Sequence, residues 1–230
     1  MKALKSILAI ALAAFSGSAM AQATYTDEGE GTRYEFRKHA FVNLEGGVQY
    51  TRGEASFGDL LSPNFQLGLG YQFSPVLAAR LQGNLYQSKG GLNGVRFGNY
   101  GQPKTQTYSY FYAAPGLDVM LNLSNLIGGY NPKRLFSLSA FLGGGANIAW
   151  HNGQVNRMAS RMTSLAQDEN LEYLWDGTKI RPYGRAGLEA AFRLSDQVAL
   201  TVEGNANILS DHYNSKKADN PDWYFNALVG

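Results

Sequence analysis

Eight charged side chains are spaced so that they could act together, although they are spread over most of the chain. In the stretch RPYGRAGLEAAFRL, residues 181–194, four of them recur at every fourth position and share one parity. Arginines and carboxylates arranged in this way can form a closed salt-bridge network, a gate or ion path, or a catalytic carboxylate pair. The eight are Glu45, Arg80, Asp118, Arg181, Arg185, Glu189, Arg193 and Glu203.

The elements that carry these charges are predicted to be β-strands. Apolar and polar residues alternate with a period of two in eight runs of near-strand length, and no helical stretch is comparably clear. This pattern predicts an all-β chain, an eight-stranded antiparallel up-and-down transmembrane β-barrel. The runs are 39–52, 64–73, 76–87, 107–123, 135–151, 181–194, 198–209 and 223–230.

The connections between the runs differ in length at the two ends of the predicted barrel. Two of them are short turns, Ser74-Pro75 and the three residues 195–197, and the connection 124–134 is intermediate. Four connections on the opposite end are long, which is the asymmetry of outer-membrane barrels. They are 53–62, about 88–106, about 152–178 and 211–222.

The composition of the polar face favours a membrane barrel over a soluble barrel of the lipocalin type. This face holds mostly Gly, Asn, Gln, Ser, Thr and Tyr, with Tyr86 among them and charges placed singly, whereas a water-facing surface is rich in Lys, Glu and Asp. We therefore expect the apolar face to contact outer-membrane lipid and the charges to point into the bore. Aromatic residues form two expected interface bands, Tyr50, Phe65, Phe111, Trp150, Trp223 and Phe225 near the long loops and Phe73, Phe136 and Phe192 near the short turns.

Hairpin geometry predicts how the inward residues meet. The Ser74-Pro75 turn pairs Gly70 with Arg80, and a narrow bore requires such pairing of large with small residues. The turn at 195–197 sets Glu189 opposite Glu203, with Arg80, Arg185 and Arg193 as candidate clamps between the carboxylates. We favour a network that plugs the bore, and the gate and the catalytic pair stay open as alternatives.

The first 21 residues predict a cleavable signal peptide, because two lysines accompany the apolar run from Ile7 to Phe15, and the small-residue cleavage pattern Ala19-Met20-Ala21 follows it. Residues 22–38 form a polar periplasmic lead-in, and residues 39–230 form the barrel. The chain has 20 Lys and Arg against 18 Asp and Glu, so loss of Lys2 and Lys5 leaves a net charge of zero, which argues against nucleic acid as a partner. There is no cysteine, so no disulfide is expected.

The segment LNLSNLIGGYNPKRLFSLSAFLGGG, together with the signal and the eight runs, resembles the N-terminal barrel of OmpA-related proteins of the Bacteroidales type. The resemblance implies an outer-membrane anchor, often followed by a periplasmic domain that binds peptidoglycan. Such a domain is not present in this chain, and the terminal aromatic of the family is missing after the last run. We therefore expect the last strand to be truncated.

Two other functions fit the same pattern. One is a narrow porin-like channel for small solutes, and the other is an outer-membrane enzyme that hydrolyses lipid or peptide. The three histidines, His39, His151 and His212, show no catalytic triad spacing and no H-E-x-x-H motif, so we expect no enzyme, no cofactor and no metal. The loop 152–178 is the expected surface for an extracellular ligand. Pro115, inside the fourth run, predicts a bulge or a local bend.

Overall fold

A computed structural model describes residues 25–27, 32–95, 104–162, 171, 174–215 and 220–230. The predicted signal peptide lies outside the described residues. Within the described part of the chain, no helix is long and apolar enough to cross a membrane. The elements are β1 (Tyr25–Asp27), β2 (Thr32–Tyr34), β3 (His39–Thr51), the 3-10 turn η1 (Gly58–Leu60), β4 (Leu61–Gln72), β5 (Leu77–Val95), β6 (Lys104–Asn122), α2 (Leu123–Gly128), β7 (Phe136–Trp150), α3 (Gly153–Ala159), β8 (Lys179–Arg193), β9 (Ala199–Leu209) and β10 (Asp222–Val229).

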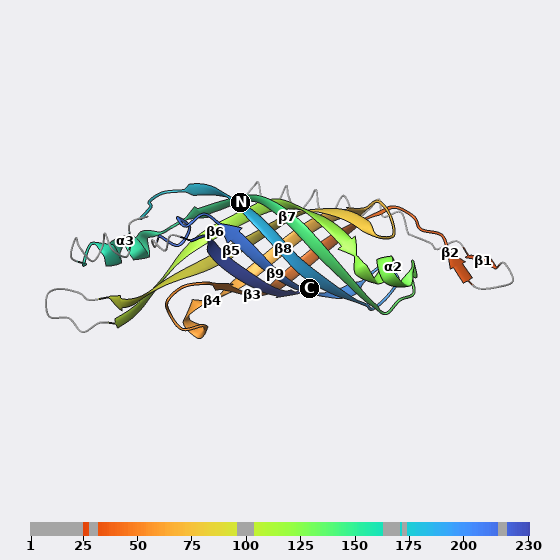
Figure 1. Cartoon of the computed structure of the whole chain (residues 1–230), viewed down its shortest axis with the longest axis horizontal. Coiled ribbons are helices and arrows are strands. Elements are labelled where there is room, and N and C mark those ends of the chain that lie inside the picture. The colour runs from red at the N-terminus through yellow and green to blue at the C-terminus, as the bar shows by residue number, and fades with distance from the viewer. Residues whose placement is uncertain (1–24, 28–31, 96–103, 163–170, 172–173, 216–219) are drawn as a thin grey trace, which may run out of the picture.

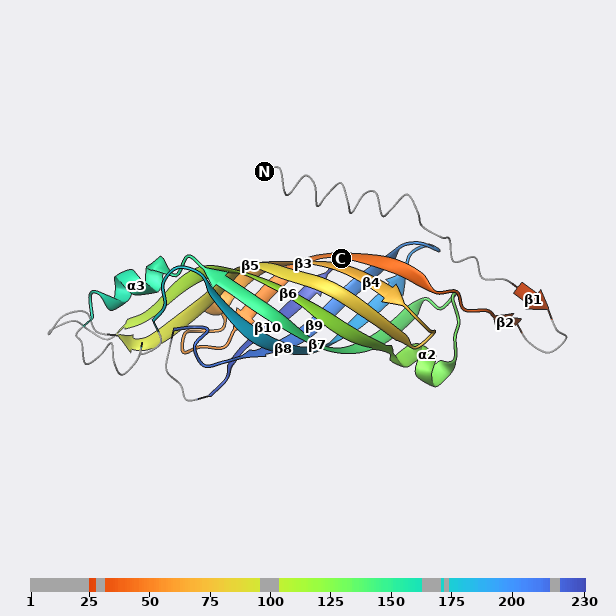
Figure 2. The same cartoon turned by 90° about the horizontal axis from the view of Figure 1, so that it is seen from above.

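Eight of these strands close into one antiparallel ring in the order β10-β3-β4-β5-β6-β7-β8-β9, which confirms the predicted fold class. Each strand pairs with its neighbours in sequence, and β10 closes the ring against β3 from Tyr224↔Thr51 to Val229↔Gly46. Figures 1 and 2 show an elongated barrel with α3 at one end and with α2, β1 and β2 at the other. The end with α2 also carries both short turns, so it is the periplasmic end.

The lead-in segment contains a short hairpin, in which Tyr25 pairs with Tyr34 and Asp27 pairs with Thr32. The connection between β6 and β7 contains the single-turn helix α2. Asn122 caps this helix, because its side-chain oxygen accepts a hydrogen bond from the backbone N–H of Asn125 at 2.8 Å. Both features lie at the periplasmic end (Figure 1).

The connection expected at about 88–106 is largely strand, which corrects the sequence interpretation. β5 continues to Val95 and β6 begins at Lys104, with an unbroken register from Gln87↔Phe111 to Gly91↔Thr107. Glycine and polar residues dominate this part, so apolar and polar residues do not alternate clearly enough to predict a strand. The inward side chains are nevertheless packed, because Leu92, Tyr108 and Tyr110 are buried.

Two local predictions differ from the structure. Pro115 causes no bulge, because the β6–β7 register is the same before and after it, at Ala113↔Ile148 and Gly116↔Gly145, and the alternative of a local bend stays a prediction. Tyr86 does not face inward: its φ of +135° turns the ring outward, where it is 42% exposed. There it lies edge-on to Phe65 and Phe111, with ring centroids 5.8 Å apart in both cases.

The outer wall of the barrel is apolar and the bore is polar. Leu44, Leu81 and Leu142 are exposed on the outer face, whereas Asn64, Gln66 and Asn84 are buried inside. The nine expected interface aromatics all lie at least partly exposed. Near the long loops their rings form contacts around the wall, including Tyr50 with Phe225 at 6.3 Å and Phe111 with Trp150 at 6.5 Å. Near the short turns Phe136 contacts Phe192 at 5.3 Å.

Candidate functional site: the charged bore

Arg80 lies at the centre of the charged group in the bore. Its guanidinium pairs with Asp118 at 2.9 Å, with Glu189 at 2.8 Å and with Glu203 at 2.8 Å. These partners come from β6, β8 and β9, so one side chain of β5 spans the bore to three other strands. The Arg80 side chain is fully buried, and a buried cation of this kind requires such partners.

Arg185 is the second cation of the group. Its guanidinium pairs with Glu203 at 2.6 Å and with Asp118 at 3.5 Å, and it also donates a hydrogen bond to the Gln66 side-chain oxygen at 3.1 Å. Both Arg80 and Arg185 place their guanidinium carbon 4.9 Å from the ring centroid of Phe141. The aromatic ring thus positions the two cations by cation–π contacts.

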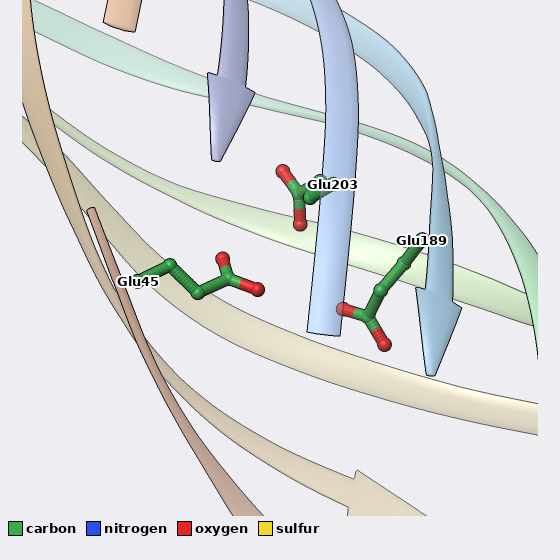
Figure 3. A group of neighbouring side chains, drawn as sticks. All are labelled: Glu45, Glu189 and Glu203. Carbon is green, nitrogen blue, oxygen red and sulfur yellow. The ribbon is translucent and has the colours of Figure 1, made fainter. Parts of the chain in front are cut away.

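Three glutamates face a common space at the centre of the bore (Figure 3). Glu45, Glu189 and Glu203 can bring one oxygen each within 4.8 Å of the others, a geometry that could hold a cation. Hydrogen bonds from neutral side chains also satisfy these carboxylates, because Gln66 and Thr201 donate to Glu45 at 2.7 Å and 2.9 Å. With Asp118 the group contains four carboxylates and only two arginines. We call these six residues the bore network.

Glycine residues on the inner face leave room for the salt bridges of the bore network. Gly143 of β7 lies between Asp118 of β6 and Arg185 of β8 in the register, so Arg185 reaches Asp118 across a position without a side chain. A Cβ at Gly143 would collide with the Asp118 carboxylate and the Leu117 carbonyl oxygen. The pairing of small with large residues is therefore a steric condition for the salt bridges.

Two of the eight charged residues lie apart from the bore network. Arg193 pairs with Asp196 in the periplasmic turn, where both side chains contact solvent. Arg181 is buried nearer the extracellular end, with its guanidinium 5.3 Å from the ring centroid of Trp175. The register does place Glu189 opposite Glu203, as the turn length predicts.

Sequence reasoning missed Phe141, Gln66 and Thr201 as partners of the charges. Phe141 has the inward parity of Ser137 and Ser139, so alternation contains the signal that places it in the bore. A search for polar residues on the inner face overlooks an aromatic residue there. The contact of Thr201 with Glu45 joins β9 to β3, which are not neighbours in the ring, and strand alternation carries no signal for it.

A layer of tyrosines, which we call the tyrosine cap, closes the bore above the network. Tyr110, Tyr112, Tyr213 and Tyr224 are buried, and Trp175 packs edge-on to Tyr110 at 5.6 Å. Tyr213 belongs to the loop after β9, and burial raises its pKa to about 12, so the hydroxyl stays neutral at physiological pH. The cap therefore adds no charge to the bore.

Asp222 holds the loop that carries Tyr213 over the bore. Its carboxylate accepts hydrogen bonds from the backbone N–H groups of Tyr213 and Asn214, at 2.9 Å and 3.1 Å. The Asn214 side chain donates a third, at 2.6 Å. This carboxylate thus anchors the loop across the extracellular mouth.

A cavity of about 320 Å³ lies at the periplasmic end of the barrel. It is lined by the first residues of β3, by Met120 and Asn122 of β6 and by Ser137 of β7, and it reaches Glu189. Solvent can therefore approach the bore network from the periplasm. We call this cavity the periplasmic vestibule.

A second, smaller hollow of about 240 Å³ lies between β6 and the segment that begins with α3, at the extracellular end. Arg157 and Arg161 of the segment that begins with α3 line it, together with Gln106 and Thr107 of β6. Gln154 ties α3 to β6, because its side-chain oxygen accepts a hydrogen bond from the Ser109 backbone at 2.9 Å. Both arginines are exposed, so the hollow is basic and open to solvent.

The closed ring of eight strands, the apolar outer face and the polar bore define a β-barrel protein of the outer membrane. No protein-family model matches the chain. The chain is similar to Outer membrane protein 40 of Porphyromonas gingivalis, with 27% identity over 242 aligned residues that cover all of this chain and 57% of that protein. It thus spans a little over half the length of this relative.

A solved structure also aligns with the chain. It is the crystal structure of Ail, the attachment invasion locus protein of Yersinia pestis, in complex with the heparin analogue sucrose octasulfate. The alignment covers 84% of this chain and 95% of Ail, with 11% identity and a TM-score of 0.42.

Proposed function

We propose that this chain is a non-enzymatic structural barrel of the OmpA type, which seats the protein in the outer membrane and presents loops outside the cell. The observation that carries the proposal is the double closure of the bore. The bore network fills its centre, and the tyrosine cap fills its extracellular half. A barrel of eight strands is only wide enough for its own side chains, so the filling of the bore by these described side chains supports a structural role.

A narrow channel is the second candidate, and the periplasmic vestibule favours it. The vestibule brings solvent as far as Glu189, so an opening between the bore network and the tyrosine cap would complete a path. Recordings from planar bilayers that contain the purified, folded protein distinguish the two functions. We expect no steady conductance, and reproducible single-channel steps that survive repeated purification would replace the structural proposal with the channel.

Envelope anchoring would require contact with peptidoglycan through periplasmic sequence outside the barrel. The relative in Porphyromonas gingivalis extends well beyond the aligned region, which supports such an arrangement. We expect the chain of 230 residues, folded in detergent, to stay in the supernatant when peptidoglycan sacculi are sedimented. Saturable co-sedimentation of this chain would instead assign peptidoglycan binding to the barrel or its lead-in segment.

The basic hollow beside α3 supports an extracellular ligand with negative charge. Arg157 of α3 and Arg161, two residues beyond the end of that helix, line the hollow together, an arrangement suited to a sulfate or carboxylate group. We expect a sulfated oligosaccharide to bind the folded protein more tightly than its neutral counterpart. The double variant Arg157→Gln/Arg161→Gln should remove that difference, whereas Arg193→Gln at the opposite rim should retain it.

The surroundings of His151 and His39 do not favour hydrolysis. His151 is exposed and lies edge-on to Phe111, with ring centroids 6.0 Å apart, and His39 contacts the carbonyl oxygen of Arg37 at 2.9 Å. If a lipase or peptidase activity is detected, we expect it to be unchanged in His151→Ala and His212→Ala. Loss of the activity in either variant, with the fold retained, would support an enzyme.

A further inference from the structure

Arg181 is a buried cation that the bore network does not include. The residue is 9% exposed, and its side chain lies beside that of Asn147, its partner in the β7–β8 register. Among the described residues no carboxylate lies within 4.0 Å of its guanidinium, and the Nη1 atom has no hydrogen-bond partner. Its guanidinium carbon lies 5.3 Å from the centroid of the Trp175 ring.

Other buried polar atoms around Arg181 also lack aligned partners. Neither end of the Asn147 amide, nor the hydroxyls of Tyr110, Tyr213 and Tyr224, makes an aligned hydrogen bond among the described residues, although the Tyr213 hydroxyl lies close to Ser88, Asn147 and Tyr110. These groups lie together: the Tyr213 ring is 5.2 Å from Tyr110 and 5.8 Å from Tyr224, and the Asn147 amide lies close to the Tyr213 and Tyr224 hydroxyls. So many buried polar groups without aligned partners are rare in native proteins, and their concentration here indicates a binding site for a small ligand.

The nearest acidic group, the Asp222 carboxylate, already accepts hydrogen bonds from the loop after β9. Asp222 interacts with Arg181 only at longer range, and its two oxygens accept three hydrogen bonds from the loop that carries Tyr213. It cannot move to Arg181 without releasing that loop. The positive charge therefore requires a counter-ion from outside the described residues.

The positive charge of the Arg181 guanidinium favours an anion over water as the bound ligand. Water molecules would satisfy the amide and hydroxyl groups, but they would leave the guanidinium charge uncompensated in a medium of low dielectric. A small anion would accept hydrogen bonds from the Arg181 guanidinium, the Asn147 amide N–H and the tyrosine hydroxyls, all of which can donate. It would satisfy the donors and neutralise the charge together.

We propose that a monovalent anion of the size of chloride binds inside the extracellular half of the barrel, between Arg181, Asn147 and the hydroxyls of the tyrosine cap. The bound anion connects β7, β8 and the loop after β9. It thereby holds the cap over the bore, so closure of the extracellular mouth depends on the halide concentration.

The test measures thermal unfolding of the detergent-folded protein in 0.2 M sodium chloride and in 0.2 M sodium gluconate, since these concentrations fix the ionic strength at roughly equal values. We expect the midpoint to be on the order of 5 °C higher in chloride. Arg181→Met should remove this difference and should unfold in gluconate no earlier than the wild type, because the variant buries no unpaired charge. Arg193→Met, which changes an exposed pair at the other rim, should keep the full difference.

Diffraction supplies an independent measurement that needs no variant. Crystals grown in bromide should show an anomalous peak beside Arg181 and Asn147. Equal unfolding midpoints in chloride and gluconate would overturn the proposal, and so would density at this position that water alone explains. Retention of the halide effect in Arg181→Met would likewise assign it to another part of the barrel.

Discussion

Replacement of Arg80 by methionine tests the bore network directly. Methionine keeps most of the volume but removes the cation, and Asp118, Glu189 and Glu203 each lose an ion pair of 2.8–2.9 Å. Arg185 contacts two of these carboxylates, so Glu189 is left without a cation among the described residues. Breaking one buried ion pair typically costs about 3–5 kcal/mol.

We therefore expect Arg80→Met to lower the free energy of unfolding by about 3–5 kcal/mol at neutral pH, a range set by the buried carboxylates that lose their partner. Acidification should reduce this difference, because a protonated carboxyl needs no cation. The second change Glu189→Gln should also recover part of the loss, since it removes the carboxylate that Arg185 does not reach. Stability effects of residues in one network are not additive, so the double variant should lose less than the two single losses together.

The assay is urea unfolding of the barrel in lipid vesicles, followed by tryptophan fluorescence and by migration of unheated samples in gels. The matched control is Arg193→Met, which breaks a pair whose side chains are 28% and 89% exposed. An exposed pair contributes at most about 1 kcal/mol. The reasoning would fail if Arg80→Met were as stable as Arg193→Met, or if its loss grew as the pH fell.

Three further outcomes can be measured with the same assay. Gly143→Ala should lose about 1–3 kcal/mol because its Cβ collides with the Asp118 carboxylate, whereas Gly83→Ala, with nothing within 4 Å of the added Cβ, should be neutral. Leu81→Arg on the outer wall should cost about 2–4 kcal/mol, and Leu194→Arg near the short turn about 0–1 kcal/mol. Because burial raises the pKa of Tyr213 to about 12, its neutral form stabilises the fold fully below pH 10, and this contribution is lost between pH 10 and 12. Tyr213→Phe should weaken that alkaline loss, and an identical alkaline profile would contradict the argument.

The ring of strands could be predicted from the sequence because its cause is local and repeated. A lipid-facing wall demands an apolar residue at every second position, and short turns fix the register of the hairpins that they close. The turn at Ser74-Pro75 therefore places Arg80 opposite Gly70, and the turn at 195–197 places Glu203 opposite Glu189. The alternation of side chains along each strand was therefore sufficient to predict that these charges face the bore.

The contacts across the bore could not be predicted, because they depend on the closed ring and not on any one hairpin. Arg193 has the inward parity, yet it lies at the strand end and pairs with Asp196 in the turn. Tyr86 has the inward parity as well, but a positive φ places its ring among the outer aromatics. The buried aromatic Phe141 and the loop residue Tyr213 fill spaces whose shape exists only after the eight strands have closed.

The hairpin of β5 and β6 has a consequence for what the cell presents to its surroundings. Each of these strands has 19 residues, whereas about 9–11 residues are enough to cross the hydrocarbon layer. The remaining residues, at about 3.3 Å each and tilted by about 40°, carry the extracellular ends of these two strands on the order of 20 Å above the acyl chains. Antibodies and bacteriophages that approach the bacterium would meet this projection before any other described strand. Immune and phage selection should therefore concentrate sequence change near the extracellular ends of β5 and β6, while packing constrains the wall below.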